Sequence, residues 1–311
     1  VLRASGDYNG NPFEATGDVT GLGNAPLSPS VTFEYEQFES STWSGIVGAP
    51  TNAGAYRVRS NFAGNTNYTS GSSDWTAFAI TAKAITVSAN AGQYKYCGQI
   101  DPTFAYTSSE TLAAGNSWSG ALARTAGEDV ATSPYDYNIG TLSAGSNYNV
   151  TLTGTNKFEI KSVSIDASAS SQPVAIGDFA TLSATVVNES LTLVEGVSVS
   201  FILTYYDASG VEQTLPELTG LTQSNGIVTI SNVSLPDVKV YKVTAIAGAG
   251  CSESVAYLPV YDPSAGFVTG GGWIDSPAGA YYANASVVGK ANFGFNAKYK
   301  KGNKEVDGNT E

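Results

Sequence analysis

The sequence contains no histidine and no methionine, and it has only 2 cysteines in 311 residues. Without histidine, a Ser-His-Asp triad, a Cys-His pair and an imidazole-bound zinc or haem are excluded. Two cysteines are too few for a disulfide framework or a cysteine-based metal cluster. The missing initiator methionine indicates a processed chain or a piece of a larger one. We expect no signal peptide, because strand-like sequence begins at the first residue.

Charged residues are also scarce, at 14% of the sequence, where an ordinary soluble domain has about 25%. The formal net charge is −12, and the acidic excess lies in residues 1–262 rather than in residues 263–311. A surface this poor in cations argues against binding to nucleic acid or to an anionic membrane. No run of about 18 apolar residues is present, so we expect no insertion into a membrane.

The residues that are present predict strands. Apolar and polar residues alternate in segments such as 31–35, 181–186, 197–201 and 240–243, and this period of two is typical of antiparallel sheets with one buried face. Turn dipeptides such as Asn225-Gly226 separate these segments. No stretch of a dozen residues has helical spacing. The predicted fold class is therefore all-β.

Internal repeats divide the first half of the chain. Asn67-Tyr68 is followed ten residues later by Phe78-Ala79-Ile80, and Asn147-Tyr148 is followed in the same way by Phe158-Glu159-Ile160. Near the start of each copy, Tyr8-Asn9-Gly10 with Pro12 and Phe13 parallels Tyr96-Cys97-Gly98 with Pro102 and Phe104. We therefore interpret residues 1–81 and 82–161 as two copies of one small β-domain.

The remaining residues predict two further modules. Residues 162–262 contain about seven short strands, which is typical of an Ig-like β-sandwich. Residues 263–311 contain one obvious hairpin, and we interpret them as a truncated C-terminal β-module that needs a strand from a neighbouring chain or from sequence beyond residue 311. The junctions at residues 81–84 and 161–162 are short and lack glycine and proline, so we expect a beads-on-a-string array in which each module folds on its own core.

Cys97 and Cys251 fall in different predicted domains. One interpretation is that they are two separate thiols, packed as small hydrophobic side chains, and this is the one that we expect. The other is a disulfide, which requires the two domains to meet face to face.

Several of these segments resemble known bacterial modules. Residues 83–160 resemble the MBG domain, and the residues that carry the likeness are Lys83-Ala84-Ile85-Thr86-Val87, Gly98, Asp101-Pro102, Leu112, Gly115, Ser119-Gly120-Ala121-Leu122, Arg124, Gly127-Glu128 and Asn147-Tyr148. Residues 7–80 are similar to a related repeat, and residues 162–260 are similar to Ig-like domains of the invasin and intimin kind. The resemblance implies a large secreted surface adhesin of Bacteroidota-type bacteria. It supplies no catalytic residues.

Carboxylates near the predicted loops and junctions are candidate ligands for Ca²⁺, the one cofactor that we consider. They are Asp101, Glu128, Asp129, Asp136, Asp166 and Asp262. No Asp-x-Asp-x-Asp run is present, and the alternative is that these are solvated acids that keep the protein soluble. Glu128-Asp129 is the one adjacent acidic pair. A glycosidase needs a second carboxyl across a cleft, so we expect Glu128 to form a structural ion pair with Arg124 instead.

Aromatic residues are candidate platforms for sugar rings, and the candidates are Trp273, Tyr281 and Tyr282. The alternative is that they belong to the core. The sequence as a whole predicts a non-enzymatic stalk or adhesive fragment of a large secreted bacterial cell-surface protein. Its expected partners are other domains of the same polypeptide, a neighbouring chain at residues 263–311, and surface glycans or proteins. The alternative function is a carbohydrate- or protein-binding accessory region of a secreted multidomain hydrolase.

Overall fold

The computed structural model describes residues 2–264, 267–280, 286–299 and 306–310. These residues form strands and three short 3-10 segments, with no α-helix among them, so the predicted all-β class is confirmed. The chain divides into two compact units. The first unit comprises residues 1–95 and 101–160, and the second comprises residues 96–100 and 161–311. The 3-10 segments are η1 (Leu22–Asn24), η2 (Val130–Thr132) and η3 (Ser168–Ser171).

The first unit begins with a mostly antiparallel sheet in the order β1-β6-β4-β2-β3, with β5 paired to β4. Its short first strand runs parallel to β6, whereas β6, β4, β2 and β3 pair antiparallel. The strands are β1 (Gly6–Asp7), β2 (Thr32–Glu39), β3 (Thr42–Ile46), β4 (Gly54–Phe62), β5 (Gly71–Ser72) and β6 (Thr76–Thr81).

Two smaller sheets complete the first unit. One has the order β10-β11-β13-β8, and the other has the order β12-β7-β9, in which β12 and β7 are parallel. The strands are β7 (Lys83–Ala89), β8 (Tyr94–Tyr96), β9 (Tyr106–Ser108), β10 (Ala123–Arg124), β11 (Tyr135–Asn138), β12 (Tyr148–Thr153) and β13 (Lys157–Lys161).

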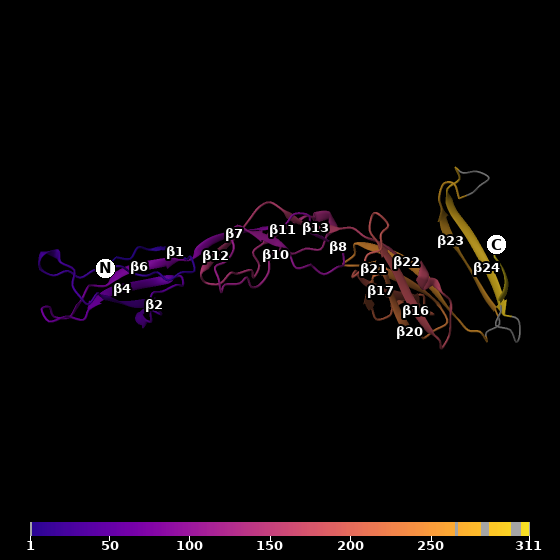
Figure 1. Ribbon diagram of the computed structural model, residues 1–311. Coiled ribbons are helices and arrows are strands. Elements are labelled where there is room, and N and C mark those ends of the chain that lie inside the picture. The colour runs from indigo at the N-terminus through magenta and orange to yellow at the C-terminus, as the bar shows by residue number, and fades with distance from the viewer. Residues whose placement is uncertain (1, 265–266, 281–285, 300–305, 311) are drawn as a thin grey trace. The chain divides into compact units, whose positions relative to one another are not determined.

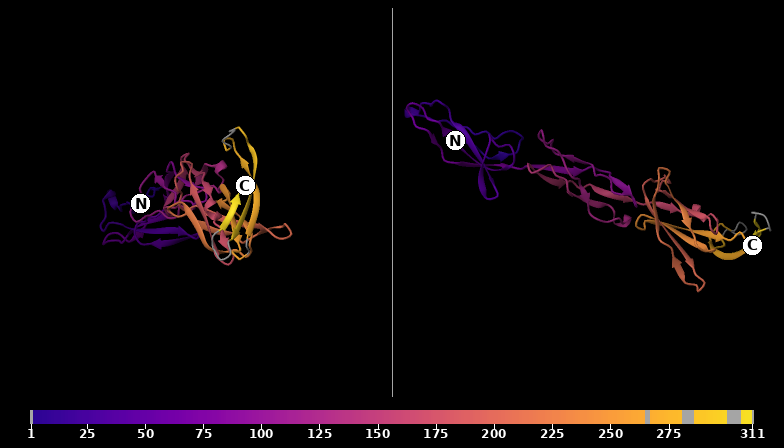
Figure 2. Two further views of the ribbon diagram at one scale, coloured as in Figure 1. Left: turned by 90° about the vertical axis from the view of Figure 1, so that its right-hand side faces the viewer. Right: turned by 90° about the horizontal axis from the view of Figure 1, so that it is seen from below.

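The second unit contains an Ig-like sandwich of two sheets (Figures 1 and 2). One sheet has the order β14-β16-β20, and the other has the order β15-β22-β21-β17-β18, with β19 also paired to β17. The strands are β14 (Ser164–Asp166), β15 (Val174–Ala175), β16 (Phe179–Val187), β17 (Ser198–Tyr206), β18 (Glu212–Thr214), β19 (Leu218–Leu221), β20 (Ile227–Ser234), β21 (Val240–Ala247) and β22 (Ser252–Tyr261).

The sandwich core follows from the alternation in the sequence. Along β17, Val199, Phe201 and Leu203 are buried, and the residues between them are only partly buried. Leu182 of β16 and Tyr241 of β21 belong to the same buried cluster. A period of two therefore turns every second side chain inward from both sheets.

Residues beyond the sandwich form an antiparallel sheet in the order β23-β24-β25. The strands are β23 (Phe267–Ser276), β24 (Gly289–Tyr299) and β25 (Val306–Thr310). In the described part of this segment, β23 and β25 lie at the two edges of the sheet. The predicted strand from a neighbouring chain stays a prediction, as do the bounds of the four predicted domains.

The repeated sequence motifs occupy corresponding places in the first unit. Phe78 and Ile80 of β6 are buried, and so are Phe158 and Ile160 of β13. In both copies, therefore, the two apolar residues of the motif face the interior.

The expectation that every module folds on its own core is wrong for the first unit. Tyr8 and Phe78 from the first copy share one hydrophobic cluster with Ile85 and Tyr148 from the second. The rings of Tyr8 and Tyr148 meet edge to face, with centroids 5.3 Å apart. Only Ala82 separates β6 from β7, so the chain cannot move the two copies far apart, and their apolar ends bury one another.

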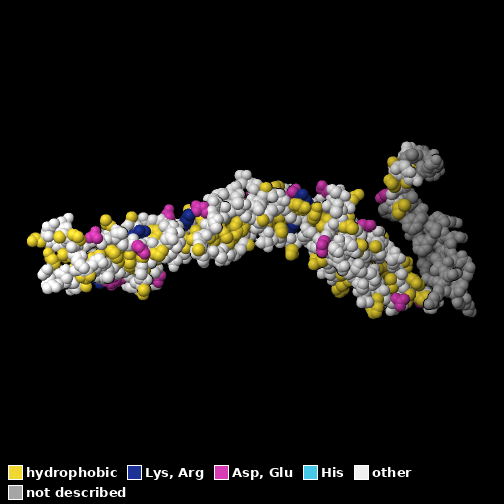
Figure 3. Space-filling view, viewed as in Figure 1, with side chains coloured by type: hydrophobic (Ala, Val, Ile, Leu, Met, Phe, Trp, Pro, Cys, Tyr) yellow, Lys and Arg dark blue, Asp and Glu magenta, His cyan; other side chains and the backbone are white. Residues whose placement is uncertain are grey.

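The surface is sparsely charged, as the composition predicts. In the face drawn in Figure 3, blue and magenta side chains are few among uncharged and hydrophobic ones. Among the residues that the structure describes, no helix has the length and apolar character needed to cross a bilayer.

Candidate functional site

Cys97 and Cys251 form a disulfide, which corrects the expectation of two separate thiols. Their Cα atoms lie 6.4 Å apart, within the usual span of a disulfide, although the residues are 154 positions apart in the sequence. Cys97 comes directly after β8, in the segment 96–100 that belongs to the second unit. The expectation was wrong because this short segment leaves the repeat to which it belongs in sequence and joins the fold of the second unit.

Two glycines permit the close backbone approach beside the disulfide. Gly98 has φ +86° and Gly248 has φ +59°, in the left-handed region that favours glycine. A Cβ atom on Gly98 would lie 2.9 Å from the Cα of Gly248. Ser198 connects the two glycines, since its N–H donates to Gly98 O over 2.9 Å and its carbonyl accepts from Gly248 N over 2.8 Å. The segment is therefore held by backbone hydrogen bonds as well as by the disulfide.

A second cluster, in the first unit, consists of four charged side chains. Lys95 Nζ lies 2.7 Å from Asp101 Oδ1 and 2.6 Å from Glu128 Oε2. Arg124 donates from Nε to Asp101 Oδ2 over 2.7 Å and from Nη2 to Glu128 Oε1 over 2.5 Å. The predicted ion pair between Arg124 and Glu128 is thus present. Lys95, which the sequence analysis did not single out, completes the cluster.

Burial makes this charge cluster unusual. The side chains of Lys95 and Arg124 are only 4% and 5% exposed, whereas those of Asp101 and Glu128 are 35% and 47% exposed. Burial acts to raise the pKa of Asp101, but hydrogen bonds from Arg124 and Lys95 outweigh it and hold that pKa below its ordinary value. Two cations and two anions balance, so the cluster keeps both buried cations paired.

The same geometry bears on two of the candidate calcium ligands. Both oxygens of Asp101 and both oxygens of Glu128 already face Lys95 or Arg124. A divalent cation at these carboxylates would meet the two buried positive charges. These two carboxylates therefore suit the neutralisation of Lys95 and Arg124 better than the binding of Ca²⁺.

The other acidic candidates lie apart and have local partners. Asp129 Oδ1 accepts from Ala131 N over 2.8 Å and caps η2, and Asp136 pairs with Lys157 over 2.9 Å. Asp166 accepts from Ser168 N over 2.9 Å, and Asp262 accepts from Ser264 N over 2.8 Å. Hydrogen bonds from the Ser264 side chain and backbone lower the pKa of Asp262. In the described part of the chain, no three Cys, Asp or Glu side chains come together in a group suited to a metal ion.

The candidate aromatic platforms are only partly covered by the structure. Trp273 lies on β23, where it pairs with Asn292, and nothing is described of its side chain. Tyr281 and Tyr282 lie outside the described residues. Elsewhere, Arg57 stacks on Trp43 and Trp75, with its guanidinium carbon 4.5 Å from each ring centroid. Cation–π contact of this kind covers those two rings with a side chain of the protein itself.

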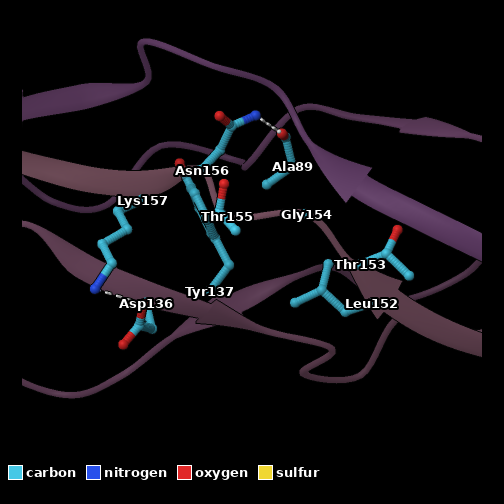
Figure 4. Close-up of a pocket in the computed structure, with 9 residues that line it drawn as sticks. All are labelled: Ala89, Asp136, Tyr137, Leu152, Thr153, Gly154, Thr155, Asn156 and Lys157. Atoms are coloured by element: carbon cyan, nitrogen blue, oxygen red, sulfur yellow. Dashed lines mark hydrogen bonds and ion pairs between the residues drawn. The ribbon is translucent and has the colours of Figure 1, made fainter.

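A small hollow lies beside the turn between β12 and β13 (Figure 4). Its volume is about 210 Å³, below the roughly 300–1,000 Å³ of pockets that hold small ligands. Two of its polar side chains already have partners, since Asn156 donates to Ala89 O over 2.8 Å and Lys157 pairs with Asp136. The small volume makes the hollow a poor site for a small ligand.

The comparison with protein families bears on the middle of the chain, where the charge cluster lies. Residues 85–158 match the MBG domain family, YGX type. The match covers Asp101, Arg124 and Glu128, and it supports the prediction of an MBG-type repeat at residues 82–161. The similarity of residues 7–80 to a related repeat stays a prediction. No curated protein matches the chain.

Solved structures of tandem β-domains align with the chain at low similarity. A tandem fragment of titin is 13% identical, with a TM-score of 0.30, over 75% of this chain and 89% of that one. The S-layer protein SbsC is 10% identical, with a TM-score of 0.21, over 94% of this chain and 49% of that one. Fibronectin(III)-like modules of CbhA from Clostridium thermocellum are 8% identical, with a TM-score of 0.18, over 84% and 91%. TM-scores of this size do not establish a shared arrangement of modules.

Proposed function

We propose that this chain is a non-enzymatic spacer in a secreted bacterial cell-surface protein, where it holds a binding region at a distance from its anchor. The observation that carries the proposal is the coupling between consecutive modules. Tyr8 and Tyr148 share one core across the boundary between the two repeats, instead of lying in modules joined by a flexible linker. A spacer needs such coupling because an uncoupled chain of modules does not keep its reach.

Two further observations support this proposal. The MBG match supports a repeat architecture for the first half of the chain. The Cys97–Cys251 disulfide supports an oxidising location, because disulfides persist outside the cytosol and are rare within it. A secreted or cell-surface protein of a bacterium of the Bacteroidota type fits both the repeat architecture and the oxidising location.

The test is a replacement of the chain within its parent protein. One version substitutes the chain by unrelated, coupled β-domains of equal total length, and a second version deletes it. We expect the replacement to restore adhesion or ligand capture at the cell surface and the deletion to lose it. If deletion leaves surface function unchanged, or if only the native chain restores it, the spacer proposal is wrong. In the latter case, binding of the purified chain to a glycan array would favour the accessory binding region.

A further inference from the structure

The two Tyr-x-Gly segments, residues 8–10 and 96–98, follow the starts of the two repeats. Tyr8 comes directly after β1, and Tyr96 is the last residue of β8. Gly10 and Gly98 adopt nearly the same left-handed backbone conformation, with φ +81° and +86°. Sequence and backbone therefore agree that the two loops are equivalent. We call each of them a Tyr-x-Gly loop.

The first loop contacts residues that come after its own repeat in the sequence. The Tyr8 side chain is 4% exposed, and its hydroxyl accepts a hydrogen bond from Asn116 Nδ2 over 2.8 Å. A Cβ atom on Gly10 would lie 2.7 Å from Ala113 Cβ. All of these residues belong to the first unit. The loop therefore binds an asparagine amide and fits against a small residue.

The second loop makes the same two contacts within the second unit. The Tyr96 hydroxyl accepts from Asn188 Nδ2 over 2.9 Å, and its ring packs against the sandwich core. A Cβ atom on Gly98 would lie 2.9 Å from both Gly248 Cα and Val197 Cγ1. Here too the tyrosine binds an asparagine amide, and the glycine lies against the backbone of another glycine, Gly248, as well as against the Val197 side chain.

The middle residue is where the two loops differ. Asn9 is exposed, and its side chain accepts from Asn11 N over 2.9 Å within the loop itself. Cys97 is fully buried and forms the disulfide with Cys251. The contacts shared by both loops are therefore noncovalent, and the disulfide is an addition to the second loop only.

We propose that the Tyr-x-Gly loop is a docking element with which each repeat binds the module that follows it in the sequence. The receiving module must present a side-chain amide to the tyrosine hydroxyl, and an alanine or glycine to the loop glycine. Each part has a physical reason. Tyrosine carries a polar group at the far end of an apolar ring, so it can be buried and still donate or accept. Glycine allows both the positive φ and the contact of two backbones. This inference does not depend on the proposed function.

The alternative explanation is that Gly10 and Gly98 are required only by their own turns. Two other glycines of the chain separate these explanations. Gly48 has φ +76° and Gly145 has φ +87°, and a Cβ atom on either would meet nothing within 4 Å. Alanine at these control positions has the same backbone cost as alanine in the loops, but no steric clash.

The experiment is hydrogen exchange with mass spectrometry on the full-length chain. We compare Gly10→Ala with Gly48→Ala, and Gly98→Ala with Gly145→Ala. We expect Gly10→Ala to raise the opening equilibrium of the peptide that contains Asn116 by roughly tenfold or more relative to its control. Gly98→Ala should do the same at the peptide that contains Asn188.

A second set of variants keeps the inference testable if a loop variant fails to fold. Ala113→Gly, combined with Gly10→Ala, makes room for the new Cβ and should restore most of the lost protection at Asn116. Tyr8→Phe retains the ring and should raise exchange at the same peptide, while β2 and β4 keep their protection. If each loop variant behaves like its control, and if Ala113→Gly restores nothing, the Tyr-x-Gly loop is a turn and not a docking element.

Discussion

Cys97 and Cys251 are bonded to each other across 154 positions of sequence, and Cys97 has no exposed surface. The bond closes a loop that contains most of the second repeat and most of the Ig-like sandwich. The disulfide therefore connects Cys97 to Cys251 covalently without the residues between them. Two predictions follow from this connection, and two more from the charge cluster.

Loss of the disulfide should lower the stability of the second unit. A closed loop of this length restricts the unfolded chain, and removal of a native disulfide costs about 2–5 kcal/mol. We expect Cys97→Ser with Cys251→Ser to shift the urea midpoint of the sandwich transition to lower concentration. Reductant should shift the wild type in the same direction and leave the double variant unchanged. Equal midpoints for oxidised wild type and double variant would contradict the prediction.

The disulfide should also shield the enclosed residues from stretching. When the chain is pulled from its two ends in a single-molecule force experiment, residues between the cysteines bear no load while the bond is intact. After reduction, the fully extended length should grow by roughly 500 Å, since 154 residues become available at about 3.4 Å each. The double serine variant serves as the control and should give the longer extension under all conditions. The same length before and after reduction of the wild type would refute the bond.

Removal of Arg124 should be far more costly than removal of an exposed cation. Arg124→Gln leaves Asp101 and Glu128 sharing only Lys95 at a buried site, which should cost roughly 2–4 kcal/mol in unfolding free energy. Lys157→Gln is the matched control, because Lys157 pairs with Asp136 at the surface, and it should cost less than about 1 kcal/mol. Chemical denaturation measures both values. The burial argument fails if the two variants lose the same amount.

The charge cluster should also make the first unit sensitive to acid. The pKa of Asp101 is lowered in the folded chain from its ordinary value of 3.8, so folding favours the ionised form. Its contribution is complete above about pH 4, and it is lost as the pH falls through the lower, folded pKa. We expect the stability difference between wild type and Asp101→Asn to shrink as the pH falls from about 4 to about 2. A difference that stays constant over this range would show that the pKa of Asp101 is the same in the folded and the unfolded chain.

Sequence patterns predicted what depends on neighbours along the chain. Alternation placed Val199 and Phe201 on the buried side of one strand, and the predicted ion pair joins Arg124 and Glu128, which are close in the sequence. Lys95 was missed because a lysine is rarely expected on the buried side of a strand. One signal was available, since Lys95 occupies the inward position of an alternating Tyr-Lys-Tyr strand.

The sequence by itself determined the all-β class, the repeated motifs and the equivalence of the two Tyr-x-Gly segments, because each of these follows from the period of side chains along one strand or from direct comparison of residues. Only the tertiary structure decided that Cys97 meets Cys251, that Tyr8 and Tyr148 share a core, and that Lys95 belongs to a cluster of four charges. The physical reason is that such contacts join residues far apart in the chain. Their distance depends on how whole sheets pack, and no local pattern encodes it.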